Sequence, residues 1–252
     1  MQRAVLKTSK LSKTFSNGGM QQHILKNLDL EIYNGDFTVI MGSSGAGKST
    51  LLYALSGMDK PTLGEIYFGN QEITGLSNDK LAIFRRKNCG FVFQQIYLLD
   101  NMSVMDNIIA CGLLLSGNKK EIAERARKLL SAVGLNENVW HKFPSQLSGG
   151  EAQRCGIVRA LINNPGILFA DEPTGALNSS SGIAVLNVLT EVNEKGQSII
   201  MVTHDLKSAL RGSRIIYLKD GSVCGECNLG TYRGEDENRN TALLSFLKEM
   251  GW

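Results

Sequence analysis

The hydrophobic pattern of this chain alternates between short apolar strands and helical stretches. Residues 37–41 (FTVIM) form an uninterrupted apolar run, which is typical of a strand buried on both faces. Similar runs occur at residues 89–93, 166–170, 198–203 and 214–219. Residues 28–33 alternate apolar and polar positions, which predicts a half-buried strand near a sheet edge. Together these runs predict an α/β fold with parallel strand pairing in the middle.

The pattern changes between Gln94 and Pro165, where no strand-like run occurs. Helical runs at residues 102–115 and 118–134 are followed by a third helix, which begins after LSGG and ends near Asn163. We therefore predict one domain over residues 1–252 with an inserted helical lobe. The lobe is residues 95–165, and the core around it is residues 1–94 and 166–222.

The last part of the chain, residues 223–252, is predicted to form a hairpin and a helical tail. Asp220-Gly221 indicates a tight hairpin turn. The acidic, Asn-rich start of the tail predicts a loop, and residues 241–250 predict a short helix closed by Gly251. The tail's apolar residues suggest packing on the core, with docking of a partner as the alternative: Leu243, Leu244, Phe246, Leu247 and Trp252.

Composition limits the classes of protein that fit. The chain is 42% hydrophobic and 20% charged, and its net charge of +3 gives no reason to expect nucleic acid as a partner. The longest apolar run, near residues 108–115, is too short to span a bilayer, and the first residues do not resemble a signal peptide. We expect a cytoplasmic protein. Its five cysteines, an odd number mostly in apolar runs, argue against a disulfide framework.

One glycine-rich segment predicts a phosphate site. The run from Gly42 to Ser49 fits G-x-x-x-x-G-K-[ST] and lies between an apolar strand and a helix that begins at Lys48. Glycines let backbone N–H groups converge on phosphate oxygens, and the helix N-terminus adds positive potential. Lys48 is predicted to reach the β- and γ-phosphates of ATP, and the Ser49 hydroxyl to ligate Mg²⁺. The predicted cradle is Gly42, Ser43, Ser44, Gly45, Ala46, Gly47, Lys48, Ser49 and Thr50.

Polar residues that end other apolar strands are candidates for catalysis. Asp171 can hold Mg²⁺ through water, and Glu172 can deprotonate the attacking water. His204 can bond the γ-phosphate, and Gln94 can ligate Mg²⁺ or the attacking water. The alternative for all four residues is ordinary loop polarity at strand ends.

A second glycine-rich segment, LSGGE, also predicts an anion site. Ser148 and Glu151 have the spacing of a capping box at a helix start. Gly149 and Gly150 lie in the first turn of that helix, where glycine lowers helix propensity. Their presence suggests that something approaches the backbone closely, and a helix N-terminus can accept a phosphate. The alternative is a plain capped helix.

The joint set of GSSGAGKST, Gln94 in FVFQQ, LSGGE, ILFADEPT and His204 in THD resembles the ATP-binding cassette (ABC) family over nearly the whole chain. The resemblance implies an ATP-binding core, an antiparallel β portion near the N-terminus and an inserted helical lobe. It implies that Phe15 stacks on adenine, although a core or strand-end aromatic is the alternative. It also implies a head-to-tail dimer with a second copy, in which each ATP lies between the phosphate loop of one copy and Ser148, Gly149 and Gly150 of the other.

Within that family the chain is similar to the cassettes for lipoprotein release, macrolide export and bacitracin-type peptide resistance, on the segments GFVFQQIYLLDNMSVMDNI and DEPTGALNS. This implies separate transmembrane permease subunits, which would hold this chain at the inner face of the membrane, and export or removal of a peptide, antibiotic or lipid-like substrate. The apolar residues 96–99 are candidates for the permease contact, and completion of the lobe's own core is the alternative. A non-transporting ABC mechanotransmitter attached to a permease-like membrane protein is the alternative. Asn178 departs from the aspartate that is usual in the family's D-loop.

Overall fold

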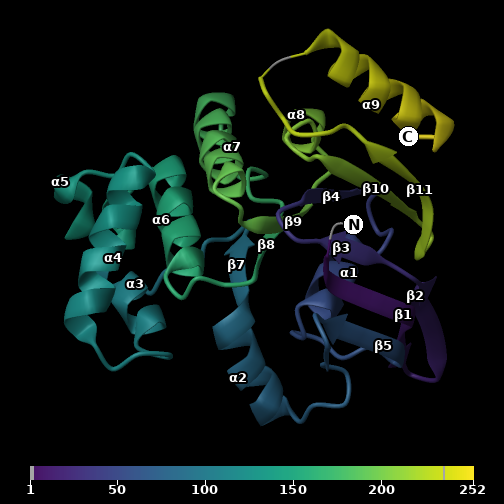
Figure 1. Ribbon diagram of the computed structural model, residues 1–252, viewed down its shortest axis with the longest axis horizontal. Coiled ribbons are helices and arrows are strands. Elements are labelled where there is room, and N and C mark those ends of the chain that lie inside the picture. The colour runs from purple at the N-terminus through teal and green to yellow at the C-terminus, as the bar shows by residue number, and fades with distance from the viewer. Residues whose placement is uncertain (1–2, 235) are drawn as a thin grey trace. The chain divides into compact units, whose positions relative to one another are not determined.

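A computed structural model describes residues 3–234 and 236–252 (Figure 1). The chain divides into two units. Unit 1 contains the described residues up to Ala82 and those from Asn193 onward, and unit 2 contains Ile83–Val192. The finer division into a core, an inserted lobe and a tail stays a prediction. Each unit is described by itself below.

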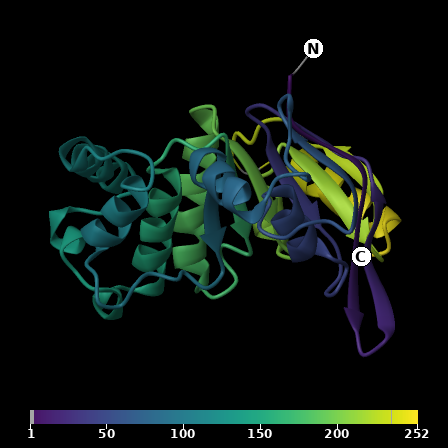
Figure 2. The same cartoon turned by 90° about the horizontal axis from the view of Figure 1, so that it is seen from below.

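Unit 1 contains two groups of strands. The first group is antiparallel with the order β2-β1-β5-β6, and β3 also pairs with β1. Figure 2 shows the β1–β2 hairpin as a long ribbon that extends beyond the other strands of this unit. The bounds of these strands are β1 (Ala4–Asn17), β2 (Met20–Leu28), β3 (Glu31–Tyr33), β5 (Leu63–Phe68) and β6 (Gln71–Glu72).

The second group of strands in unit 1 has the order β11-β10-β4-β9, in which β10, β4 and β9 are parallel and β11 is antiparallel. Every residue of β4 and β9 is buried, as the continuous apolar runs require. The elements are β4 (Phe37–Met41), α1 (Lys48–Leu55), β9 (Ser198–Val202), α8 (Leu206–Ala209), β10 (Arg214–Lys219), β11 (Ser222–Asn228) and α9 (Glu237–Glu249).

Unit 2 is mainly helical and contains one parallel pair of strands, β7 and β8. Helix α2 (Asn78–Asn88) begins in unit 1 and leads into this unit, and α7 (Ser179–Glu194) leads out of it. The other elements are β7 (Cys89–Phe93), α3 (Val104–Gly112), α4 (Lys119–Ala132), α5 (Glu137–Trp140), the 3₁₀ helix η1 (Pro144–Gln146), α6 (Gly149–Leu161) and β8 (Ile167–Asp171).

Most predicted elements are confirmed. Strands at residues 37–41, 89–93 and 214–219 have the predicted bounds, and residues 94–165, all of them described, contain helices and no strand. Asp220 and Gly221 have φ values of 50° and 79° between the paired residues Lys219 and Ser222, which is the left-handed geometry of a two-residue hairpin turn. The predicted α/β fold, with an antiparallel N-terminal β portion, parallel strands and a helical lobe, is confirmed.

The predicted strand at residues 28–33 is wrong in its extent. Leu28 ends β2, and only Glu31–Tyr33 forms the next strand. Asn27 has a φ of 50°, and the Asp29 carboxylate accepts a hydrogen bond from the Lys10 backbone N–H at 2.8 Å. The chain therefore turns at residues 27–30, and the regular alternation continues across the turn.

The predicted loop before the tail helix is wrong for residues 237–240, because α9 begins at Glu237. Asp236 caps the helix by accepting the Asn238 N–H at 2.9 Å. Arg239 is buried and donates hydrogen bonds to the backbone carbonyl oxygens of Leu210, Leu229, Gly230 and Gly212. Burial of Leu243, Phe246 and Leu247 confirms packing of the tail, whereas Leu244 and Trp252 are about half exposed.

Candidate functional site

The loop between β4 and α1 has a backbone that glycine permits and other residues do not. Gly42, Gly45 and Gly47 have φ values of 151°, 79° and 99°. A Cβ on Gly42 would lie 2.1 Å from the Leu218 carbonyl oxygen, and one on Gly47 would lie 3.0 Å from that of Ile24. A Cβ on Gly45 would meet no described atom within 4 Å. Packing therefore demands two of these glycines, and the third keeps the exposed turn left-handed.

Lys48 begins α1, as predicted, and its side chain folds back into the loop. Its ammonium donates hydrogen bonds to the carbonyl oxygens of Gly42 at 2.9 Å and Ser43 at 2.8 Å, and the residue is only 9% exposed. The N-cap of α1 is Gly47, which has no side chain, whereas side chains cap α3, α4, α6, α8 and α9. The helix start and the ammonium together give this loop a positive potential that suits an anion.

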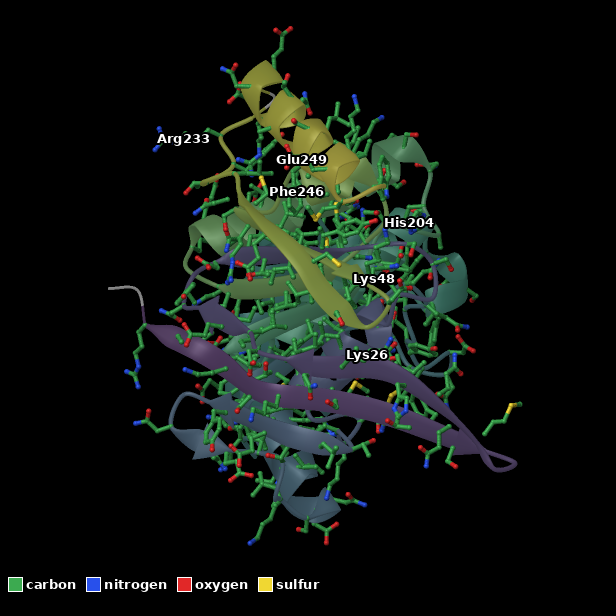
Figure 3. All side chains as sticks on the ribbon, turned by 90° about the vertical axis from the view of Figure 1, so that its right-hand side faces the viewer. Lys26, Lys48, His204, Arg233, Phe246 and Glu249 are labelled. Carbon is green, nitrogen blue, oxygen red and sulfur yellow. The ribbon has the colours of Figure 1, made fainter. Side chains whose placement is uncertain are left out.

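His204 lies at the same sheet edge as this loop. Strands β4 and β9 run parallel with Ile40 opposite Val202, so Gly42 and His204 each follow two residues later. Figure 3 labels Lys48 and His204, and both side chains lie on one side of unit 1. His204 is exposed and precedes Asp205, the N-cap of α8. Unit 1 thus brings the predicted histidine to the predicted phosphate loop.

Phe15 lies on the β1–β2 hairpin and is 46% exposed, so it is not a core aromatic. It pairs with Gln22, two residues before Ile24, whose carbonyl oxygen abuts Gly47 of the phosphate loop. Two residues of strand span about 7 Å. The aromatic ring therefore belongs to the strand pair that packs against the loop.

The two acidic residues follow the buried strand β8 in unit 2. Asp171 ends the strand and is 9% exposed, and Glu172 comes next with a φ of 47°. A non-glycine residue in the left-handed region is strained by about 1–2 kcal/mol. The Glu172 carbonyl oxygen accepts the Gly175 N–H at 3.0 Å, which holds this turn. Strain of this kind is common at functional sites, where it fixes the direction of a side chain.

Gln94 lies beside these acids in unit 2. Strand β7 pairs in parallel with β8, with Phe93 opposite Asp171, so Gln94 and Glu172 follow at the same edge. A Cβ on Gly175 would lie 2.9 Å from the Gln94 side-chain nitrogen, which places the amide against the turn after Glu172. The structure therefore brings together the predicted amide and both predicted carboxylates.

The LSGGE segment begins α6 with the predicted capping box, which is confirmed. Ser148 Oγ accepts the Glu151 N–H at 3.2 Å, and a Glu151 carboxylate oxygen accepts the Ser148 N–H at 2.8 Å. This backbone hydrogen bond is the main reason that the pKa of Glu151 lies below its ordinary value. The carboxylate stays ionised at neutral pH and holds the helix start in shape.

The two glycines of this segment have neighbours within their own chain. A Cβ on Gly149 would lie 3.1 Å from a Leu177 methyl carbon, and one on Gly150 would lie 3.0 Å from the Ser181 side chain. Gly150 is buried, whereas Ser148 and Gly149 are exposed. Internal packing therefore accounts for part of the glycine requirement, and the surface open to a second molecule is that of Ser148 and Gly149.

Asn178 in the D-loop caps α7. Its side-chain oxygen accepts the Ser181 N–H at 2.9 Å and the Ser180 hydroxyl at 3.1 Å. Asparagine and aspartate are about equally good at this position of a helix. The local fold of the D-loop therefore does not require the aspartate that is usual in the family.

Two residues that the sequence patterns did not single out hold this part of unit 2 together. The buried Gln153 on α6 donates to the Phe93 carbonyl oxygen at 2.9 Å, directly before Gln94. Arg159, also on α6, donates to the carbonyl oxygens of Ile96 and Tyr97. These two residues could have been found from the sequence, because a polar residue on the inward side of a predicted helix needs a hydrogen-bond partner inside the protein.

Tyr97 and Leu99, in the segment predicted to contact a permease, are 61% and 56% exposed. Tyr97 has a φ of 51°, and its ring packs edge-on against Phe93 with the centroids 5.5 Å apart. With Arg159 bound to the backbone, this segment is a fixed apolar surface on unit 2.

The predicted residues thus form two groups. Phe15, the phosphate loop and His204 belong to unit 1, and Gln94, Asp171, Glu172 and the LSGGE segment belong to unit 2. Among the described residues, no cluster of three or more His, Cys, Asp or Glu side chains is arranged to hold a metal ion. No helix in the described part of the chain is both long enough and apolar enough to cross a bilayer.

Several known proteins are similar to this chain in sequence or fold. Residues 25–175 match the family model described as ABC transporter. The bacitracin export ATP-binding protein BceA of Halalkalibacterium halodurans is 38% identical over 249 residues, which cover 98% of this chain and 96% of BceA. The macrolide export ATP-binding/permease protein MacB of Escherichia coli is 41% identical over 224 residues, which cover 89% of this chain and 34% of MacB. The ATP-binding cassette MJ0796, solved as a post-hydrolysis dimer bound to ADP and Pi, has a TM-score of 0.82 and 40% identity, over 91% of this chain and 100% of that chain.

Proposed function

We propose that this chain, which belongs to the ABC transporter family as its ATP-binding subunit, an ABC ATPase, hydrolyses ATP between two copies of itself. Hydrolysis would then drive a membrane permease. The observation that carries the proposal is the Lys48 ammonium held inside a glycine loop at a helix start. Such a loop binds phosphate through backbone N–H groups, and the lysine adds a charge at the β- and γ-phosphates. Phe15 supplies an exposed ring for the adenine.

The donors proposed for Mg²⁺ fit that ion chemically. Ser49, Gln94 and Asp171 offer a hydroxyl, an amide and a carboxylate oxygen, which are the hard ligands that Mg²⁺ takes. Mg²⁺ ordinarily uses few protein ligands and completes its shell with water and substrate phosphates, so no preformed cluster of acidic side chains is needed. When bound, it would offset the negative charge of the phosphates.

Glu172 is the proposed general base. It accepts a proton from the attacking water as the water oxygen bonds to the γ-phosphorus. The bond between that phosphorus and the β–γ bridging oxygen breaks, and ADP and phosphate are the products. Gln94, packed on the turn after Glu172, orients the water, and His204 at the phosphate-loop edge bonds the γ-phosphate.

The second copy contributes the LSGGE segment. Its exposed Ser148 and Gly149 lie at the start of a 13-residue helix, α6, whose dipole favours an anion. We place them, with Gly150 behind them, on the γ-phosphate of the partner's ATP, so that ATP joins the two copies head to tail. MJ0796 was solved as a dimer, which supports this arrangement. Hydrolysis then removes the link, and the pair opens.

The permease and its substrate are inferred from the relatives. BceA is a bacitracin export ATP-binding protein of nearly the same length, and MacB is a macrolide export ATP-binding/permease protein. We propose a transmembrane permease partner, a place at the inner face of the cell membrane, and export or removal of a peptide, antibiotic or lipid-like substrate.

The purified chain tests the proposal directly. ATP with Mg²⁺ is expected to shift it from monomer to dimer in size-exclusion chromatography with light scattering. Release of phosphate per chain should rise with protein concentration, since two copies are needed for one site. A monomer that hydrolyses ATP at a rate per chain independent of concentration would contradict the shared site, and absence of any ATP binding would contradict the proposal as a whole.

Tyr97→Arg tests the permease contact. A charged side chain on this exposed apolar surface should weaken co-purification with the permease from membranes and leave ATP binding by the isolated chain unchanged. Ile83→Arg is a matched control, because Ile83 is also apolar and 41% exposed in unit 2 but lies outside the 96–99 segment. Retained association of the Tyr97 variant, or equal loss in both variants, would count against this contact.

A further inference from the structure

Lys13 is a buried cation on β1, at a position where the strand pattern calls for an apolar side chain. Leu11 and Lys13 both point inward and are 0% and 9% exposed. A lysine that is taken out of water needs partners for its ammonium, and an apolar side chain would fill the same space without that requirement. Stability alone therefore gives no reason for a lysine here.

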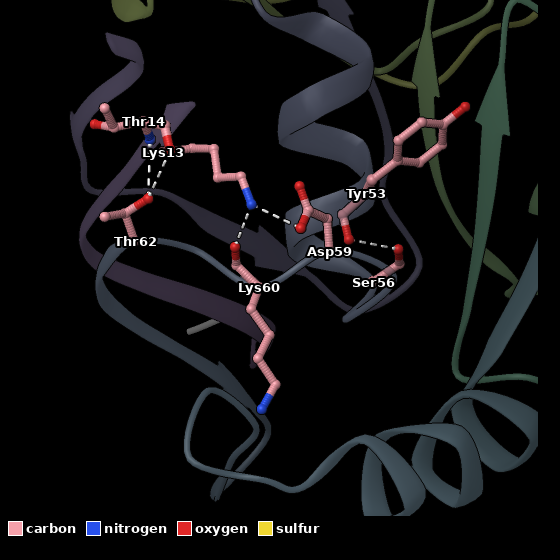
Figure 4. Close-up of polar contacts among 7 residues, drawn as sticks. All are labelled: Lys13, Thr14, Tyr53, Ser56, Asp59, Lys60 and Thr62. Atoms are coloured by element: carbon pink, nitrogen blue, oxygen red, sulfur yellow. Dashed lines mark hydrogen bonds and ion pairs between the residues drawn. The ribbon is translucent and has the colours of Figure 1, made fainter. Parts of the chain in front are cut away.

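The Lys13 ammonium joins β1 to the segment directly after the phosphate helix α1. It donates to the Asp59 carboxylate at 2.6 Å and to the Lys60 carbonyl oxygen at 2.7 Å (Figure 4). The Asp59 N–H in turn donates to the carbonyl oxygen of Tyr53 on α1 at 3.1 Å. Asp59 is thus part of the end of the helix whose other end carries the phosphate loop.

A second link fixes the same stretch of β1. The Thr62 hydroxyl accepts a hydrogen bond from the Thr14 N–H at 2.9 Å (Figure 4). The same hydroxyl donates a hydrogen bond to the Thr14 carbonyl oxygen at 3.2 Å. The backbone at Thr14 is therefore tied to the same segment after α1 that holds the Lys13 ammonium. Over the eight residues of that helix, the distance from Asp59 to the phosphate loop is set by a rigid element about 12 Å long.

The same ammonium lies over the ring of Phe15, 4.9 Å from the ring centroid. A cation at this distance is attracted to the face of an aromatic ring. Lys13 thus lies over the ring of an aromatic residue that is 46% exposed.

We propose that Lys13 is a positioning residue for adenine: it fixes the Phe15 ring against the phosphate helix, so that one ATP meets the ring and the phosphate loop together. This inference rests on the proposed ATP binding, because it assigns Lys13 to the base end of that same site. Lys13 acts through Phe15 and Asp59 and not by contact with the phosphates. The effect of its loss should therefore depend on whether the ligand has a base.

Binding of two probes to the full chain separates the base from the phosphates. Lys13→Met keeps the buried length of the side chain and removes the charge, and it is expected to weaken MgATP binding about five- to tenfold. Binding of Mg²⁺ with inorganic tripolyphosphate should change less than about twofold, since the phosphate loop is intact. Lys10→Met, on the same strand but exposed, should match the wild type for both probes. Lys13→Arg should restore most of the ATP affinity.

Two further measurements keep the test decisive if Lys13→Met is poorly folded. Asp59→Asn leaves the lysine but weakens its anchor, and it should give an intermediate loss for ATP only. In a Phe15→Trp background, ATP should quench the new fluorescence, and adding Lys13→Met should reduce that quenching. An unchanged ATP affinity, or an equal loss for ATP and tripolyphosphate, would overturn the role of Lys13. A wild-type chain that binds neither probe would instead overturn the proposed function.

Discussion

The Glu172→Gln variant is expected to lose ATP turnover by about 10²–10⁴-fold while its ATP-bound dimer accumulates in solution. The size of the loss is that of removing a general base. Glutamine has nearly the same shape as glutamate but cannot take a proton from water at neutral pH. The bound ATP should therefore persist and continue to hold the two copies together.

The Glu172→Gln substitution should leave the local backbone structure unchanged. Glu172 lies in a left-handed turn after β8, which the Glu172 carbonyl oxygen closes by accepting the Gly175 N–H. This hydrogen bond is made by the backbone, so glutamine should preserve it and the turn. Gln94 packs on the same turn and should keep its place.

Phosphate release and light scattering in the presence of MgATP measure the two expected effects. Glu191→Gln is the matched control, because Glu191 is an exposed glutamate on α7 outside the proposed site. It should hydrolyse ATP like the wild type and show no trapped dimer. Turnover of Glu172→Gln within threefold of the wild-type rate would remove Glu172 as the base, and a monomer with ATP bound would argue against the shared site.

Much of the fold was predictable because its signals are local. The short run Phe37–Met41, apolar except for Thr38, is typical of a buried strand. Ser148 and Glu151 can form their capping box from short-range contacts alone. The turn at Asp220-Gly221 is local in the same way. At these places the amino acids themselves fix the backbone.

The failures have tertiary causes. The alternation at residues 28–33 predicted one strand, but a contact with Lys10 on another strand makes the chain turn there. The early start of α9 depends on Arg239, whose partners are carbonyl oxygens of residues 210–230. Contacts between segments that are distant in sequence have no periodic signature, so such elements could be placed only after the fold was known.

The candidate site shows the same division. The glycine-rich segments and the strand-end acids are evident from residue type and spacing, because phosphate binding requires close backbone N–H groups and the reaction requires carboxylates. Lys13 is a single lysine in a strand, and its meaning depends on Asp59 and Phe15, which the fold brings to it. Nor does the sequence show that Gly150 is buried beside Ser181 of the same chain, because that contact depends on the fold.

Ser148→Arg is the second substitution with a large expected effect. It should abolish ATP-driven dimerisation and lower turnover by about 10²-fold, while a monomer still binds ATP through its own phosphate loop. Arginine cannot accept the Glu151 N–H, and its positive charge lies unfavourably at the N-terminus of α6. Its bulk also fills the exposed surface through which the partner's phosphate would approach.

Two control variants distinguish a blocked approach of the partner's phosphate from simple damage to the start of the helix. Ser148→Ala removes only the cap, which costs about 1 kcal/mol, and should lower turnover far less than the arginine does. Ser145→Arg adds the same exposed charge three residues earlier, in η1, and should behave like the wild type. Titration of each variant into MgATP, followed by light scattering and phosphate release, measures both effects. If the arginine at position 148 left dimerisation and turnover intact, the LSGGE segment would be no more than a capped helix. If it removed both effects while a monomer still bound ATP, the two anion sites of this chain would serve two different nucleotides.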